Sequence, residues 1–146
     1  MTVTFFGHRV VNKNIREKLK RVVIQLIEAE GANIFYVGNS GAFDMLVKSV
    51  LCEIAANYPC IKCSVVLQNL PQSDDNPPFD GGIDTIYPEE VESGPPRFAV
   101  CRRNEWMIKQ SDMGVSYVEH SFGGAAKYAE LSLQRGKRVI NLAESD

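Results

Sequence analysis

The sequence predicts an α/β fold: a Rossmann-like three-layer sandwich with a mostly parallel sheet of about five strands. Two observations predict this fold class. Short, β-prone apolar segments alternate with longer segments whose apolar residues recur at helical spacing. Glycines and polar residues follow the short segments, which is typical of the ends of buried parallel strands. Because crossovers in such folds are right-handed, few topologies remain, and we expect the strand order 3-2-1-4-5.

Three strands and two helices are expected in the first half of the chain. The first strand is short and apolar and stops at Gly7, as buried parallel strands do. In the helix that follows, apolar residues recur every three or four positions, and Gly31 is a suitable C-cap. Pro59 helps to end the second helix. In chain order, these elements span residues 3–6, 14–30, 34–37, 42–58 and 64–67.

The segment 68–96 interrupts this alternation. It contains six of the seven prolines of the chain and one short β-prone run, 83–87. So long a connection is usually functional or mobile. It could be a lid in which Tyr87 or Phe79 covers the base of a ligand, or a surface insertion without such a role. Regularity returns after it, with helices and strands alternating over 98–110, 113–118, 123–134 and 138–142.

Length and composition are those of a single globular domain over residues 1–146. Apolar residues make up 45% of the chain and charged residues 23%, which excludes wholesale disorder. No apolar run is long enough to span a membrane, and the N-terminus does not resemble a signal peptide. The net charge of −2 and the lack of a basic tract disfavour a nucleic-acid partner. We therefore expect a cytoplasmic domain that contacts neither membrane nor nucleic acid.

The four cysteines do not form a metal-binding pattern. Cys60 and Cys63 make one CxxC, but a zinc site would need a second such pair or two histidines at ligand spacing. A thioredoxin-type motif would open a helix, whereas Cys63 enters a predicted strand. We expect buried or edge thiols in a reducing compartment, and neither a metal ion nor a cofactor.

Three polar, glycine-bearing turns are expected to meet at one edge of the sheet. Ligands of open α/β sheets bind beyond the carboxyl ends of the strands, where the strand order reverses. In the order 3-2-1-4-5, that point lies between the first and fourth strands. The turns concerned are 7–9, 38–41 and 119–124, and they hold both histidines of the chain, His8 and His120. The sequence thus predicts a ligand site at this edge.

These turns offer groups that suit an anion. Glycine permits close backbone approach, and a helix N-terminus presents unpaired N–H groups with partial positive charge, so 39–41 and 123–124 can form phosphate cradles. Arg9 can pair with an anion bidentately or be an ordinary solvated arginine. His8 can bond or stack with a ligand, or serve only the turn. Arg103 lies on the helix before the fourth strand and can face the same cleft.

These motifs resemble those of the SLOG superfamily over nearly the whole chain. The similarity lies in the Gly7-His8-Arg9 turn, the run from Gly38 to Asp44, the pair Gly123-Gly124 followed by Glu130, and the segment Arg103-Asn104-Glu105-Trp106-Met107. The superfamily includes the lonely-guy phosphoribohydrolases, the Smf/DprA DNA-processing proteins and the YpsA-like proteins, and the small YpsA-like branch is the most similar. The resemblance implies a Rossmann-like fold that binds nucleotides or nucleotide-derived ligands.

The phosphoribohydrolases carry the signature PGGxGTxxE and an essential arginine on the preceding helix. On this resemblance Glu130 and Arg103 would be catalytic, cleaving the N-glycosidic bond of a nucleoside monophosphate through an oxocarbenium-like state. Phe122, Ala126 and Lys127 stand where the signature has proline, glycine and threonine. Lys127 could replace part of the lost phosphate cradle by a point charge. Similarity to these enzymes also implies a homodimer.

The leading hypothesis is a domain that binds a small nucleotide-type ligand and could hydrolyse its N-glycosidic bond. The alternative is a non-catalytic sensor or sequestering module for such a ligand, whereas a DNA-processing role is disfavoured by the charge. Besides the two catalytic candidates, the candidate ligand-binding residues are Gly7, His8, Arg9, Gly38, Asn39, Ser40, Gly41, Asp44, Asn104, His120, Ser121, Gly123, Gly124 and Lys127.

Overall fold

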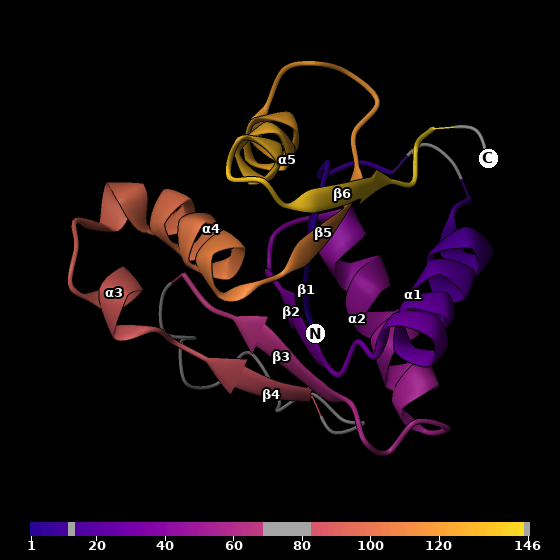
Figure 1. The fold of residues 1–146 in the computed structure, drawn as a ribbon. Coiled ribbons are helices and arrows are strands. Elements are labelled where there is room, and N and C mark those ends of the chain that lie inside the picture. Colours follow the sequence, from indigo (N-terminus) through magenta and orange to yellow (C-terminus); the bar gives the residue numbers. More distant parts are fainter. Residues whose placement is uncertain (12–13, 69–82, 145–146) are drawn as a thin grey trace.

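A parallel sheet forms the centre of the computed structural model, which describes residues 1–11, 14–68 and 83–144. Within these residues the sheet has six strands in the order β4-β3-β2-β1-β5-β6, and every neighbouring pair is parallel (Figure 1). The strands are β1 (Thr2–Gly7), β2 (Ile34–Val37), β3 (Lys62–Val66), β4 (Ile83–Ile86), β5 (Met113–Tyr117) and β6 (Arg138–Asn141).

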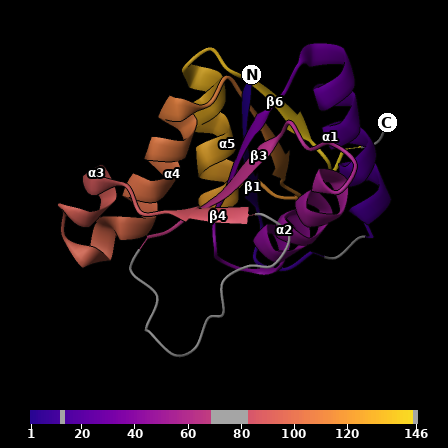
Figure 2. The same cartoon turned by 90° about the horizontal axis from the view of Figure 1, so that it is seen from below.

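Helices cover both faces of this sheet (Figure 2). The described helices are α1 (Arg16–Glu30) and α2 (Ala42–Ala55) on one face, α4 (Ala99–Gln110) and α5 (Gly124–Gln134) on the other, and α3 (Glu89–Glu92) with the 3-10 turn η1 (Pro96–Phe98) between β4 and α4. None of them is long and apolar enough to cross a membrane. The arrangement is the three-layer Rossmann-like fold that the sequence predicts.

Neighbouring residues of β1 pack into two separate apolar clusters, one beneath each helical layer. Phe5 belongs to the larger cluster, together with Leu19 of α1. Phe6 points the other way, into a smaller cluster with Met107 of α4 and Tyr128 of α5. Side chains alternate between the two faces of a strand, and both faces are covered here. This double burial explains why the consecutive residues Phe5 and Phe6 are both apolar.

The predicted strand order is confirmed, with one strand added at the edge. The short run 83–87 forms β4, which pairs with β3 outside the five strands of the predicted order. α2 ends at Ala55, three residues earlier than predicted, and the Asn57 N–H bonds to the carbonyl of Ile54 only three residues back, as in the tightened last turn of many helices. α3 was not predicted, because a helix of four residues leaves no periodic pattern in the sequence.

The segment 68–96 lies partly outside the described residues. Phe79, one of the two side chains that would cover a ligand if the segment were a lid, falls in the part that is not described. Tyr87, the other, packs against the larger apolar cluster and does not line the pocket described below. Of the two alternatives for this segment, the described part therefore does not favour the lid, because Tyr87 follows directly on β4 and packs beside the sheet.

Candidate functional site

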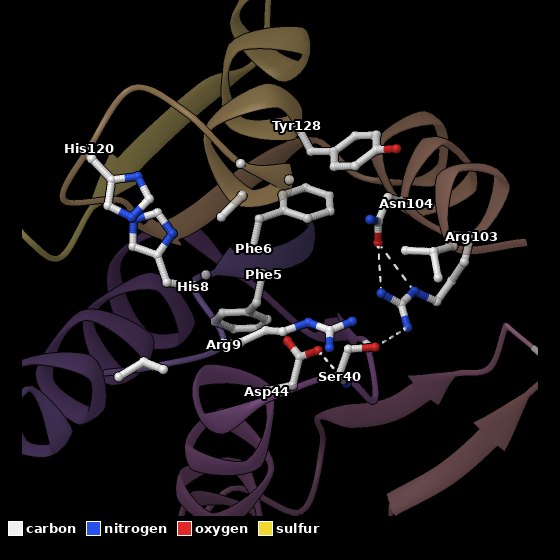
Figure 3. A pocket seen from close by; sticks show the side chains of 17 residues that line it. Phe5, Phe6, His8, Arg9, Ser40, Asp44, Arg103, Asn104, His120 and Tyr128 are labelled. Carbon is white, nitrogen blue, oxygen red and sulfur yellow. Dashed lines mark hydrogen bonds between the residues drawn. The ribbon is translucent and has the colours of Figure 1, made fainter. Parts of the chain in front are cut away.

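A pocket of about 510 Å³ opens at the carboxyl ends of β1, β2 and β5 (Figure 3). It lies where the chain leaves β1 toward α1 on one face of the sheet and leaves β5 toward α5 on the other. Such a reversal is the switch point at which open α/β sheets bind their ligands. A pocket therefore lies where the sequence places the ligand site.

Most of the predicted site residues line this pocket. They are Gly7, His8, Arg9, Gly38, Ser40, Asp44, Arg103, Asn104, His120, Gly123 and Gly124. The predicted residues that do not line it are Asn39, Gly41, Ser121, Lys127 and Glu130. The three turns and α4 thus converge, while Lys127 and Glu130 of α5 and three of the turn residues stay outside.

Gly41 and Asn39 shape the turn after β2 without lining the pocket. Gly41 has φ of +93°, and a Cβ built there would lie 2.7 Å from the Cα of Arg9. Its lack of a side chain lets the N–H of Ala42 donate to the carbonyl of Arg9 at 2.8 Å, which joins two of the turns. Asn39 accepts a hydrogen bond from the buried Lys48 ammonium at 2.9 Å.

Glu130 lies outside the pocket, although the resemblance implies a catalytic role for it. It is exposed, and its Oε1 accepts a long 3.5 Å hydrogen bond from Gln134. Tyr128 faces the pocket, and at 3.6 residues per turn a side chain two positions later points about 200° away. Ser121 and Lys127 are exposed too, and the Lys127 ammonium lies 5.3 Å from the centre of the Tyr128 ring.

Arg103 brings a buried guanidinium to the pocket wall. The residue is 3% exposed. Its Nη1 donates to Gln68 Oε1 at 2.7 Å. Nη1 also donates to Ser40 Oγ at 3.3 Å, while Nε and Nη2 donate to Asn104 Oδ1 at 3.2 and 3.1 Å (Figure 3). All these acceptors are neutral, and no carboxylate of the described residues forms an ion pair with it. Burial lowers the pKa of this guanidinium, and Asp44 opposes that effect.

Asp44 lies close to this guanidinium and is also buried, at 6% exposure. Its Oδ2 accepts the backbone N–H of Ser40 at 2.8 Å, so the carboxylate holds the turn that leads into α2. A Cβ added to Gly38 would lie 2.9 Å from both Asp44 Oδ2 and Arg103 Cζ. Burial raises the pKa of Asp44, while the Ser40 N–H and nearby cations, Arg103 first among them, act in the opposite direction.

Arg9 adds a second guanidinium at the mouth of the pocket. It is exposed, and its side chain forms no hydrogen bond or ion pair with any other residue that the structure describes. Figure 3 shows the Arg9, Ser40 and Asp44 side chains on one side of the hollow, with Phe6 and Tyr128 across from them. Within the described lining, two guanidiniums therefore accompany one carboxylate, which leaves an excess of positive charge.

The N-terminus of α5 opens into the same pocket without a side-chain cap. Gly123, with φ of +94°, precedes the helix, and the N–H of Lys127 is the donor to the Gly123 carbonyl. The N–H groups of 124–126 therefore have no partner inside the helix, and Gly124 and Ala125 line the pocket. A Cβ built on Gly124 would meet nothing within 4 Å, so the space above this helix end is open.

The two histidines stack on one another at the pocket rim. The rings of His8 and His120 lie 3.9 Å apart at 13°, and the ring of Phe122 continues the stack at 3.8 Å from His120. His8 Nε2 accepts the backbone N–H of Glu119 at 2.9 Å, so the neutral ring carries its proton on Nδ1. Burial first, and then the nearby His120, lower the pKa of His8.

An apolar wall completes the pocket, and sequence reasoning did not assign it there. Phe6 and Tyr128 stack with ring centroids 5.9 Å apart, and Val100 and Ala125 line the hollow beside them. Phe6 belongs to the strand that the sequence predicts to be buried, and it also packs in the smaller apolar cluster. The sequence held a usable signal for Tyr128, because it lies four residues after Gly124 and therefore on the same face of α5.

The sequence matches no known family model and no curated protein. Within the described ranges, no three His, Cys, Asp or Glu side chains come together in a way that could hold a metal ion.

Proposed function

We propose that this protein binds a small anionic ligand of the nucleotide type in the pocket at the carboxyl ends of β1, β2 and β5. The proposal agrees with the resemblance of its turns to the SLOG superfamily. It is carried by the chemistry of the lining, in which two guanidiniums and an uncapped helix N-terminus face one hollow. Such groups favour phosphate, since guanidiniums bind it bidentately and helix N-termini offer N–H donors.

The observation that carries most of this argument is the buried guanidinium of Arg103. Moving a cation out of water costs several kcal/mol unless an opposite charge compensates it. The hydrogen bonds of Arg103 go to neutral oxygens, and Asp44, the nearest carboxylate on the pocket wall, has a pKa that burial raises. An anion bound in the pocket would supply the missing negative charge.

The size and the apolar wall of the pocket favour a ligand with a ring as well as an anionic group. A volume of about 510 Å³ lies within the usual range of small-molecule sites, about 300–1,000 Å³. Phe6, Tyr128 and Val100 offer a dry surface against which a planar base can pack. A nucleoside monophosphate combines these two parts.

Hydrolysis of an N-glycosidic bond is a second candidate, and one observation bears on it. The reaction needs a carboxylate near the sugar, and Asp44 is the one carboxylate among the described residues that line the pocket. Release of free base that survives Glu130→Ala but is lost in Asp44→Asn would support this candidate. If nucleotides bind and no base is released, the sensor or sequestering module is the better description.

Binding is tested by thermal shift and calorimetry with adenosine 5′-monophosphate and inorganic phosphate. A ligand that binds the folded state raises the melting temperature by mass action. Hydrogen bonds to a charged group contribute about 1.5–3 kcal/mol, so we expect Arg103→Gln to weaken binding by roughly 10- to 150-fold. Arg135→Gln is the matched control, because it removes the same charge from an exposed residue outside the pocket.

Two results would contradict the proposal. One is that neither phosphate nor any nucleotide raises the melting temperature of the intact protein. The other is equal affinity in Arg103→Gln and Arg135→Gln, with both variants folded. The second result would locate the binding of anions elsewhere on the surface.

A further inference from the structure

One oxygen of the buried Asp44 carboxylate has no hydrogen-bond donor among the described residues. Oδ2 accepts the Ser40 N–H at 2.8 Å, and the described part of the chain provides no donor to Oδ1. In that same part, the side-chain nitrogen and oxygen atoms that are fully buried and lack a hydrogen-bond partner are the Oγ atoms of Ser64 and Ser116, and Asp44 Oδ1 is not among them. Oδ1 of Asp44 is therefore not sealed in the interior, and Asp44 lines the pocket. It is an acceptor open to the ligand volume.

The surroundings of Asp44 restrict what can donate to this oxygen. An ionised carboxylate accepts hydrogen bonds, so the ligand must bring an O–H or N–H group. The positive charges of Arg103, Lys48 and Arg9 act on Asp44. They would repel an ammonium group on the ligand. A neutral donor therefore fits this position better than a cationic one.

The position of Asp44 relative to the guanidinium restricts the donor further. Arg103 Cζ and Asp44 Oδ2 both lie 2.9 Å from the point where a Cβ of residue 38 would stand. These two atoms are thus no farther apart than twice that distance. If Arg103 holds the phosphate of an ester, the groups beside Asp44 lie only a few bonds from that phosphate. In a nucleotide, the hydrogen-bond donors at this distance from the phosphate are the hydroxyls of the sugar, whereas the base is farther from the phosphate.

We propose that Asp44 determines the specificity of the pocket by accepting a hydrogen bond from a sugar hydroxyl of a phosphate ester. The chemistry it selects is a pentose 5-phosphate unit, either free or as part of a ribonucleotide. This inference rests on the proposed function, because it assumes that the phosphate occupies the space beside Arg103. Asp44 lowers the affinity for bare anions and raises the preference for hydroxylated ones.

The test compares three probes by calorimetry on the intact protein: methyl phosphate, ribose 5-phosphate and adenosine 5′-monophosphate. Methyl phosphate carries the same anion without a hydroxyl. We expect ribose 5-phosphate to bind at least about tenfold more tightly than methyl phosphate, as for a hydrogen bond to a charged group. If adenosine 5′-monophosphate binds more tightly still than ribose 5-phosphate, the preferred ligand is the nucleotide and not the free sugar phosphate.

The variant Asp44→Asn separates the hydroxyl contact from the charge. Asparagine can still accept the Ser40 N–H, but its amide presents a donor to the ligand in place of the free acceptor. We expect the preference for ribose 5-phosphate to fall to about threefold or less, while methyl phosphate binds as tightly as before or more tightly, because one negative charge is lost. Asp84→Asn is the matched control, an exposed residue of β4 at which the same change should alter neither affinity.

The possible outcomes distinguish a failure of this inference from a failure of the proposed function. If no phosphate compound binds, the proposed function fails and the inference fails with it. If methyl phosphate binds as tightly as ribose 5-phosphate to the unmodified protein, the pocket takes anions but Asp44 does not select hydroxyls. This comparison needs no variant, so it decides the question even if Asp44→Asn does not fold. A preference unchanged in a folded Asp44→Asn also overturns the inference.

Discussion

Gly38→Ala should disturb the pocket more than its one methyl group suggests. The added Cβ would lie 2.9 Å from Arg103 Cζ and from Asp44 Oδ2, closer than real Cβ contacts. The backbone of Gly38 is not in the left-handed region, so alanine causes no conformational strain there. The steric overlap must instead be relieved by movement of the neighbouring side chains. The Arg103 guanidinium, at the end of a long side chain, is the group that can move.

The magnitude follows from the bonds that hold that guanidinium. Displacement of Arg103 weakens its bonds to Gln68, Ser40 and Asn104. A hydrogen bond from a charged donor contributes about 1.5–3 kcal/mol, so the loss of one such bond sets the scale of the expected decrease in the free energy of unfolding. We expect Gly38→Ala to lower this free energy by about 1–3 kcal/mol. We also expect it to weaken phosphate binding about tenfold or more, because Arg103 no longer faces the anion.

Gly114→Ala is a matched control for this experiment. Gly114 is also a buried glycine, on β5, but a Cβ there would meet its nearest neighbours at 3.8 Å, an ordinary contact. Urea denaturation of both variants, with calorimetry for phosphate, provides the comparison. The reasoning is refuted if Gly38→Ala is as stable as Gly114→Ala and binds phosphate with the affinity of the unmodified protein.

Two further predictions concern the neighbouring turns. The pKa of His8 is lowered from 6.5, so the unfolded chain takes up a proton at higher pH than the folded protein, and the free energy of unfolding should fall as the pH drops below about 6.5. Urea titrations from pH 8 to 5.5 should show a smaller decline in His8→Gln, and an equal decline would exclude His8 as the cause. Gly7→Ala should be severely destabilising, by roughly 3 kcal/mol or more, because its Cβ would lie 2.1 Å from the ring of the buried Phe43. An unchanged melting temperature in that variant would contradict the prediction, since it would show that β1 and α2 can move apart at Gly7 and Phe43 without loss of stability.

The sequence was sufficient to predict the strand order and the place of the pocket. Both follow from features that a single chain displays: apolar runs of strand length, helical periodicity between them, and glycines at strand ends. The end of β1 is an example. A strand that is buried on both faces is rich in apolar residues, and this one ends at a glycine because the Phe43 ring leaves no room for a side chain at position 7. The edge strand β4 was also visible as a β-prone run, although the short helix α3 was not.

The sequence was not sufficient to orient α5 or to assign the pocket wall. The resemblance placed Glu130 at the site, but the face of α5 that carries Tyr128 packs against Phe6, and this packing turns Glu130 to solvent. That rotation depends on contacts between β1 and α5, which are far apart in the sequence. The partnership of Arg103 with Gln68 has the same origin, since no local pattern connects residues on separate elements.

We propose above all that the turns after β1 and β2, the N-terminus of α5 and Arg103 of α4 bind one anion between them. Titration of the isotope-labelled protein with ribose 5-phosphate, followed by amide and arginine Nε–H resonances, tests it most directly. We expect saturable shifts at the N–H groups of Gly124 and Ala125 and at the side chain of Arg103, with one common dissociation constant. Saturable shifts confined to other surfaces, or none at these three residues, would contradict it.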